Sequence, residues 1–140
     1  MKATTGLLAA LLLSIVSAAQ AAPAPYLVID HSTEILMDQA TALSIWKEHR
    51  MPEKFGKLYP TSKWGFASQV EGGFDDAKTC IITARAMMLP RSGKALLFKP
   101  AQTATTFGTL PGATADQCRA LAKTKLSEAI ASVRDSLVPR

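Results

Sequence analysis

The sequence is sparing in cysteine, histidine and aromatic residues. Its 140 residues include two cysteines and two histidines, and Phe, Trp and Tyr together make up only 6%. So few cysteines exclude a disulfide-dense miniature scaffold. Hydrophobic residues make up 48% and charged residues 19%, a balance that excludes a disordered tail or a collagen-like fibre. We therefore expect one globular domain, because this length leaves no room for a second of ordinary size.

No apolar run is long enough to cross a membrane. The most apolar stretch, residues 7–16, contains about ten residues, whereas a spanning helix needs about 20. Lys2 precedes this stretch, and Ala19-Gln20-Ala21 after it fits the A-x-A pattern that signal peptidase cuts. Residues 1–21 are therefore predicted to be a cleaved signal peptide rather than a membrane anchor. The mature domain, residues 22–140, is then exported to a periplasm or secreted, and it is not membrane-spanning.

Export makes the two cysteines interpretable, because an exported chain meets an oxidising environment. Cys80 and Cys118 allow only one intramolecular pairing. A redox or metal-binding role is disfavoured, since the spacing is not C-x-x-C and no histidine lies near either cysteine in the sequence. We expect a structural disulfide, which the chain-entropy model values at about 4 kcal/mol for a loop of this length.

The first part of the mature chain predicts a strand, a helix and a loop. Residues 26–30 form a short β-type run, and His31-Ser32-Thr33 offers helix N-cap candidates. From Thr33 to Arg50 apolar residues recur every three or four positions, as on one face of an amphipathic helix. These apolar positions are Ile35, Leu36, Ala40, Leu43 and Trp46. Pro52 ends the helix, and residues 52–62 are expected to form a loop.

The middle of the chain is predicted to be β. Alternating residues indicate strands at 64–70, 79–89 and 94–99, and the threonine-rich residues 103–109 are a candidate for a further strand. Turns are expected at Glu71-Gly72-Gly73 and at Pro90-Arg91-Ser92-Gly93. One face of the second strand is entirely apolar or sulfur-containing: Cys80, Ile82, Ala84, Ala86 and Met88.

The chain ends in a long predicted helix. Thr114 and Gln117 form a capping-box pattern, and an apolar stripe that includes Cys118 follows as far as about Leu137. The predicted fold class is therefore α+β, a two-layer sandwich of a three- or four-stranded antiparallel sheet with two helices. Its element order is β-α-β-β-β-(β)-α, with one disulfide that ties the last helix to the central strand.

The common catalytic motifs are missing. We find no G-x-S-x-G, no phosphate-binding glycine loop and no Cys/His nucleophile pair. Ser44-Ile45-Trp46-Lys47 matches S-x-x-K, but the partner motifs and the chain length of penicillin-recognising enzymes are lacking. Asp30, His31 and Glu34, with His49, are candidates for weak metal or acid–base chemistry. A helix N-terminus with acidic groups explains the first three more simply, so we predict no catalytic residue, no metal and no cofactor.

The strongest candidate for a functional surface lies between Trp46 and Phe66. These residues include five of the nine aromatics and an excess of three positive charges. Trp46, Trp64 and Phe66 lie on apolar faces and are expected in the core. Cations and aromatics in a loop are typical of recognition surfaces, although a plain solvated loop is the alternative. The candidate binding residues are Lys47, Arg50, Lys54, Phe55, Lys57, Tyr59 and Lys63.

Charge and export together limit the partners. Lys2 is the only charged residue of the leader, so the mature chain keeps an excess of four basic residues. Export argues against nucleic acid and leaves acidic proteins, anionic cell-wall polymers and lipid headgroups. The basic turn Arg91-Ser92-Gly93-Lys94 is a second, smaller cationic position, which could equally protect a sheet edge.

We expect a non-enzymatic binding protein of the bacterial envelope, such as an inhibitor, an immunity factor or an accessory factor. Its partner would be an envelope or extracellular protein, or an anionic cell-wall polymer. The alternatives are a structural envelope component that acts by self-association and a small metal-dependent hydrolase.

Overall fold

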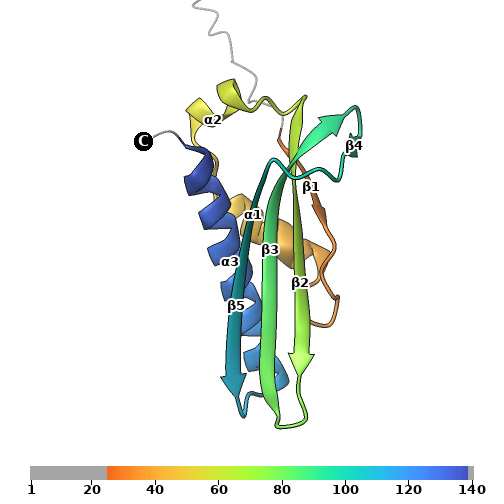
Figure 1. The fold of residues 1–140 in the computed structure, drawn as a ribbon, viewed down its shortest axis with the longest axis vertical. Coiled ribbons are helices and arrows are strands. Elements are labelled where there is room, and N and C mark those ends of the chain that lie inside the picture. Colours follow the sequence, from red (N-terminus) through yellow and green to blue (C-terminus); the bar gives the residue numbers. More distant parts are fainter. Residues whose placement is uncertain (1–24, 139–140) are drawn as a thin grey trace, which may run out of the picture.

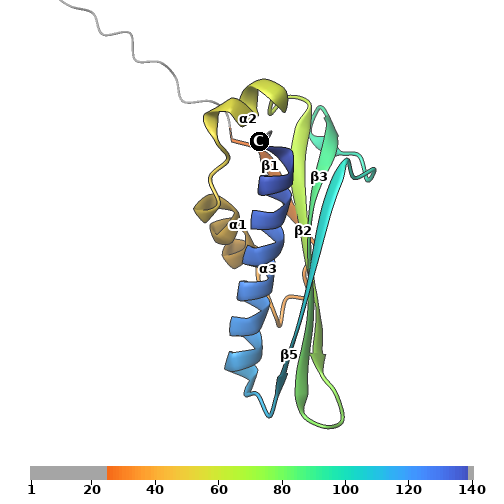
Figure 2. The same cartoon turned by 60° about the vertical axis from the view of Figure 1, so that its left-hand side comes forward.

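The computed structural model describes residues 25–138 and confirms the α+β prediction (Figure 1). The predicted signal peptide lies outside the described residues. Helices cover one face of a twisted sheet (Figure 2), and none of those described is long and apolar enough to span a membrane. In chain order the elements are β1 (Leu27–Asp30), α1 (Gln39–Glu48), α2 (Glu53–Leu58), β2 (Trp64–Phe74), β3 (Thr79–Ser92), β4 (Ala95–Leu96), β5 (Gln102–Pro111) and α3 (Ala115–Leu137).

β3 is the central strand of the sheet. It pairs antiparallel with β2, from Trp64 opposite Pro90 to Phe74 opposite Cys80, and with β5 along its other edge. A short antiparallel pairing with β4 follows at the end of β3. These pairings confirm the predicted antiparallel strands. β1 adds to the free edge of β2 in parallel, so the complete sheet is mixed.

The core lies between the sheet and the helices. Every second residue of β3 from Cys80 to Met88 is fully buried, which confirms the predicted apolar face. The capping box of Thr114 and Gln117 opens α3 as predicted. Cys80 and Cys118 form the expected disulfide, with their Cα atoms 5.6 Å apart. The bridge fastens the first turn of α3 to the beginning of β3.

The predicted start of the first helix at Thr33 is wrong. α1 begins at Gln39, because the Asp38 carboxylate accepts hydrogen bonds from the Thr41 amide at 2.8 Å and from the Thr41 hydroxyl at 2.9 Å. Ile35, which the periodicity assigned to the apolar face, lies before this cap and is 73% exposed. An apolar spacing that continues across a loop therefore extended the predicted helix too far.

The predicted turn at Glu71-Gly72-Gly73 is also wrong. β2 runs on to Phe74, and the chain turns at residues 75–78. Gly72 is required inside the strand for a different reason: its φ is 135°, and a Cβ there would lie 1.9 Å from the Ile81 carbonyl oxygen. This glycine permits a close approach of two strands rather than a reversal of the chain.

Two further boundaries differ from the prediction. Residues 90–92 continue β3, so the turn falls at Gly93 and Lys94, and β4 is much shorter than the strand predicted for 94–99. The loop predicted for 52–62 contains the helix α2, which begins after Pro52. Six residues are too few for apolar periodicity to reveal a helix.

Candidate functional site

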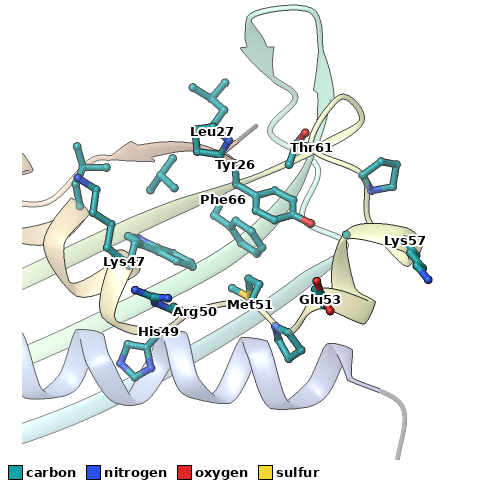
Figure 3. Close-up of a pocket in the computed structure, with 17 residues that line it drawn as sticks. Tyr26, Leu27, Lys47, His49, Arg50, Met51, Glu53, Lys57, Thr61 and Phe66 are labelled. Carbon is teal, nitrogen blue, oxygen red and sulfur yellow. The ribbon is translucent and has the colours of Figure 1, made fainter. Parts of the chain in front are cut away.

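A cavity of about 1040 Å³ lies at one end of the molecule, between the C-terminal end of α1, the helix α2 and the start of β1 (Figure 3). Its volume is at the upper end of the range typical of small-ligand sites. The lining is mostly apolar and includes Tyr26, Trp46, Met51 and Phe66. Segments from three separate parts of the chain thus form one concave site.

Three aromatic rings form the rigid part of the lining. The ring centroids of Trp46 and Phe66 are 4.9 Å apart, and Tyr26 meets Phe66 edge-on at 5.1 Å. The rings come from the segment before β1, from α1 and from β2, and Trp46 and Phe66 are buried. Aromatic side chains in such contact have few alternative rotamers, so this wall is preorganised for an apolar ligand group.

A buried hydrogen-bond chain fixes the indole of Trp46. Trp46 Nε1 donates to Ser68 Oγ at 3.1 Å, and Ser68 Oγ donates to Asp30 Oδ1 at 2.7 Å. Ser32 Oγ donates to the same carboxylate oxygen at 2.8 Å. Ser68 is fully buried, and a buried hydroxyl is stable only when its hydrogen bonds are satisfied. The chain therefore links β1, α1 and β2 beside the cavity.

The rim of the cavity is cationic. Lys47 and Arg50 lie near the end of α1, and Glu53 and Lys57 lie on α2, where the Lys57 side chain extends away from Glu53 and Met51 (Figure 3). All four residues are exposed to solvent. The salt bridges found among residues 25–138 involve other cations, so the three positive charges are not neutralised there by a carboxylate contact. An apolar cavity with a positive rim favours a ligand that is both apolar and anionic.

His49 lies where α1 ends, between the cavity and α3. Its Nε2 is 2.6 Å from Ser127 Oγ. Desolvation holds the pKa of His49 below its usual value, and the nearby charge of Arg134 acts in the same direction, while Glu48 and Asp135 oppose the shift. The neutral imidazole is therefore the favoured form in the folded protein.

The structure brings together three of the seven candidate binding residues. Lys47, Arg50 and Lys57 line the cavity, whereas Lys54 and Lys63 are exposed outside its lining. The remaining candidates, Phe55 and Tyr59, are not part of the lining either. The cationic part of the predicted surface is therefore divided between the cavity rim and the open exterior.

Phe55 and Tyr59 are structural rather than exposed. Phe55 is only 2% exposed, so its assignment to a surface is corrected: it packs in the core beneath α2. Tyr59 is half-buried against Phe55 and Trp64, and its backbone carbonyl accepts a hydrogen bond from the Tyr26 hydroxyl. Both residues hold α2 on the domain and so form the support of the cavity wall.

Sequence analysis missed Tyr26, Met51 and Gly56 as parts of the site. Tyr26 lies 40 residues before Phe66, and their rings meet because β1 pairs in parallel with β2. Gly56 carried no signal of a site, because glycine is ordinary in the loop that the sequence predicts for residues 52–62. A Cβ at Gly56 would meet no atom within 4 Å, so this position faces open space.

The candidates for metal or acid–base chemistry do not assemble in the described part of the chain. Among residues 25–138 no group of three His, Cys, Asp or Glu side chains is arranged to hold a metal ion. Asp30 accepts the hydrogen bonds of Ser68 and Ser32, while His31 and Glu34 are exposed. Asp30 therefore has a structural role in the network beside the cavity.

Comparisons with known proteins add no family to this description. No protein-family model matches the sequence, and no curated protein matches it either. The functional argument therefore depends on the cavity, its rim and the chemistry of the residues that form them.

Proposed function

We propose that this protein is an exported, non-enzymatic binding protein that recognises an acidic partner at the cavity end. The observation that carries the proposal is an apolar cavity of about 1040 Å³ whose opening bears Lys47, Arg50 and Lys57. Export is supported by the signal-peptide pattern of residues 1–21 and by the disulfide, since disulfides persist in oxidising compartments.

The lining favours an acidic protein over an anionic cell-wall polymer. A protein can insert an apolar side chain into the cavity while neighbouring carboxylates meet the cationic rim. A polymer of sugars and phosphates offers charge and sugar faces that can stack on an aromatic ring, but no large apolar side chain to fill the cavity. Large apolar anchors that fill preformed pockets supply most of the binding energy in protein interfaces.

A second candidate function is favoured by the size of the cavity. A volume of about 1040 Å³ accommodates a small amphipathic anion without any protein partner. Such a ligand would carry a carboxylate, phosphate or sulfonate at the rim and an apolar body against the three rings. The two candidates share one chemistry and differ in whether the apolar anion is free or belongs to a protein.

The proposal is tested by capturing partners with the oxidised mature protein, residues 22–140, in a soluble envelope extract with cross-linking and mass spectrometry. The triple variant Lys47→Ala/Arg50→Ala/Lys57→Ala removes the rim charges without touching the core. We expect the wild type to enrich one discrete protein, and the variant to lose binding by on the order of tenfold or more.

A matched control changes the same number of charges elsewhere. Lys54→Ala/Arg85→Ala/Lys123→Ala replaces three exposed cations that do not line the cavity. It should capture the partner as the wild type does, with the same thermal stability as the rim variant. Equal loss in both variants would show binding by net charge alone, and no loss in either would place recognition elsewhere; both results contradict the proposal.

A further inference from the structure

An apolar tip projects from the sheet at the hairpin of β3 and β4 (Figure 1). We define the β4 tip as residues 93–99. Within it Leu97 is 50% exposed and Phe98 is 72% exposed. Two adjacent large apolar side chains in water are costly, so their exposure calls for a partner that removes them from water.

Backbone hydrogen bonds hold the tip in a defined shape. The Leu97 amide donates to the Pro90 carbonyl at 2.8 Å, and the Lys99 amide donates to the Leu97 carbonyl at 2.6 Å. The second bond closes a tight turn centred on Phe98. The Ala101 amide then donates to the Met88 carbonyl at 2.9 Å and returns the chain to the sheet. The turn therefore presents Phe98 outward without a large flexible loop.

The neighbouring Leu96 anchors the tip from below. It packs with Ala67, Met87 and Leu89 in a small apolar cluster of its own, separate from the main core. A Cβ added at Gly65 would lie 2.5 Å from Leu96 Cδ2, so the leucine occupies the space above this glycine. The inward Leu96 and the outward Leu97 and Phe98 thus have distinct roles.

The charged residues of the tip segment and of the hairpin that carries it are all positive. Lys94 and Lys99 flank the two apolar residues and are exposed. Arg91 braces the hairpin, because its side chain donates to the carbonyls of Gly93 at 2.7 Å and Thr61 at 2.8 Å. No acidic residue occurs in the sequence from 77 to 115, so the chain segment that forms the tip carries no compensating carboxylate.

We propose that the β4 tip docks the protein on an anionic lipid surface. Leu97 and Phe98 enter the boundary between headgroups and acyl chains, and Lys94 and Lys99 remain at the level of the lipid phosphates. The inference is independent of the cavity and of the proposed function, since none of the tip residues lines the cavity.

A lipid surface is favoured over an acidic protein because the β4 tip combines an exposed apolar pair with flanking lysines. The apolar pair projects outward on a turn, and a bilayer receives such a projection without requiring a complementary pocket. Stable membrane association takes two signals, and the tip supplies both an apolar group and flanking cations. The closely spaced lysines also match the charge of an anionic headgroup layer.

The test is flotation of the oxidised mature protein with vesicles of equimolar phosphatidylglycerol and phosphatidylcholine, and with pure phosphatidylcholine vesicles. We expect binding to the anionic vesicles that weakens with added salt, and little binding to the neutral ones. Leu97→Ala/Phe98→Ala should weaken binding roughly tenfold or more. Lys94→Gln/Lys99→Gln should weaken it by about fivefold per lysine.

Matched controls separate insertion from simple adsorption. Phe107→Ala removes an exposed phenylalanine of β5, and Arg85→Gln/Lys123→Gln removes two exposed cations elsewhere; both should bind as the wild type does. The fluorescence of Phe98→Trp should be quenched by brominated acyl chains in bound vesicles, beyond any quenching of Trp46 and Trp64 in the wild type.

Three outcomes would overturn the proposal. The first is no binding to anionic vesicles. The second is unchanged binding after Leu97→Ala/Phe98→Ala, which would mean electrostatic adsorption alone. The third is displacement by soluble polyglutamate with no quenching at position 98, which would assign the tip to an acidic protein.

Discussion

The indole N–H of Trp46 donates a hydrogen bond of 3.1 Å to the buried hydroxyl of Ser68. This bond joins α1 to β2. Ser68 in turn donates a hydrogen bond to the Asp30 carboxylate of β1. A ring that lines the cavity is thereby fixed by a polar contact as well as by packing. The network gives the cavity wall a defined shape through contacts within the chain, and a preformed site lowers the entropic cost of the binding proposed above.

Removal of the Ser68 hydroxyl should therefore lower the stability of the fold. Ser68→Ala leaves the buried Trp46 indole N–H without its acceptor and removes one of the two hydroxyl donors of the part-buried Asp30 Oδ1. We expect the free energy of unfolding in urea to fall by about 2 kcal/mol. Ser44→Ala, at an exposed position of α1, is the control and should change it by less than about 0.5 kcal/mol. Equal effects at both positions would mean that the network contributes nothing specific.

The disulfide should stabilise the fold mainly by restricting the unfolded chain. Cys80 and Cys118 are 38 residues apart, so Cys80→Ala/Cys118→Ala should lower the free energy of unfolding by about 4 kcal/mol. The comparison is made by urea denaturation of the variant and the oxidised wild type. Because the chain-entropy model acts on the unfolded state, a loss below about 1 kcal/mol would contradict this account.

Two glycines should respond in opposite ways to alanine. Gly72→Ala places a Cβ against the Ile81 carbonyl at a backbone φ of 135°, so we expect a loss of at least about 2 kcal/mol. Gly56→Ala adds a methyl group to a helix with open space around it and should stabilise the protein by up to about 1 kcal/mol. Thermal and urea unfolding measure both changes, and similar results for the two variants would be inconsistent with the strand geometry at Gly72.

Acid should destabilise the protein partly through His49. Its pKa is lower in the folded protein than in the unfolded chain, so the unfolded chain takes up the proton first as the pH falls. Stability is unaffected by this group above its usual pKa and decreases as the pH drops below about 6.5. His49→Gln should reduce the loss of unfolding free energy between about pH 7.5 and pH 5.5. An undiminished loss in His49→Gln would contradict this account of His49.

The sequence was most informative where one pattern extended over many residues. The capping box at Thr114, the apolar stripe of α3 and the alternation from Cys80 to Met88 each combine several agreeing signals, and all are confirmed. The disulfide followed because two cysteines leave only one intramolecular pairing. These features are local in the sequence or limited by simple counting.

The boundaries of the helices and strands and the position of the cavity could not be predicted, because they depend on single contacts or on residues far apart in the sequence. The start of α1 depends on which of several polar residues caps the helix. Asp38 is the N-cap, because its carboxylate accepts hydrogen bonds from Thr41. The cavity depends on Tyr26 and Trp46 both meeting Phe66, and the contact of Tyr26 follows from the parallel pairing of β1 with β2. Composition drew attention to Lys47, Arg50 and Lys57, which line the cavity, but it could not separate them from the buried Phe55.

The most direct test of the cavity as an apolar-anion site is a fluorescence titration with anilinonaphthalenesulfonate, an apolar sulfonate, and with the uncharged phenylnaphthylamine. Three proteins are compared at one salt concentration: the wild type, the rim variant Lys47→Ala/Arg50→Ala/Lys57→Ala, and Gly56→Phe, which adds a ring at a lining residue whose Cβ position has no atom within 4 Å.

We predict one sulfonate bound per wild-type chain, with binding weakened on the order of tenfold in the rim variant and lost in Gly56→Phe. The uncharged probe should bind more weakly to the wild type and be insensitive to the rim substitutions. Equal sulfonate binding by all three folded proteins would contradict the account, because it would place the apolar anion outside the cavity.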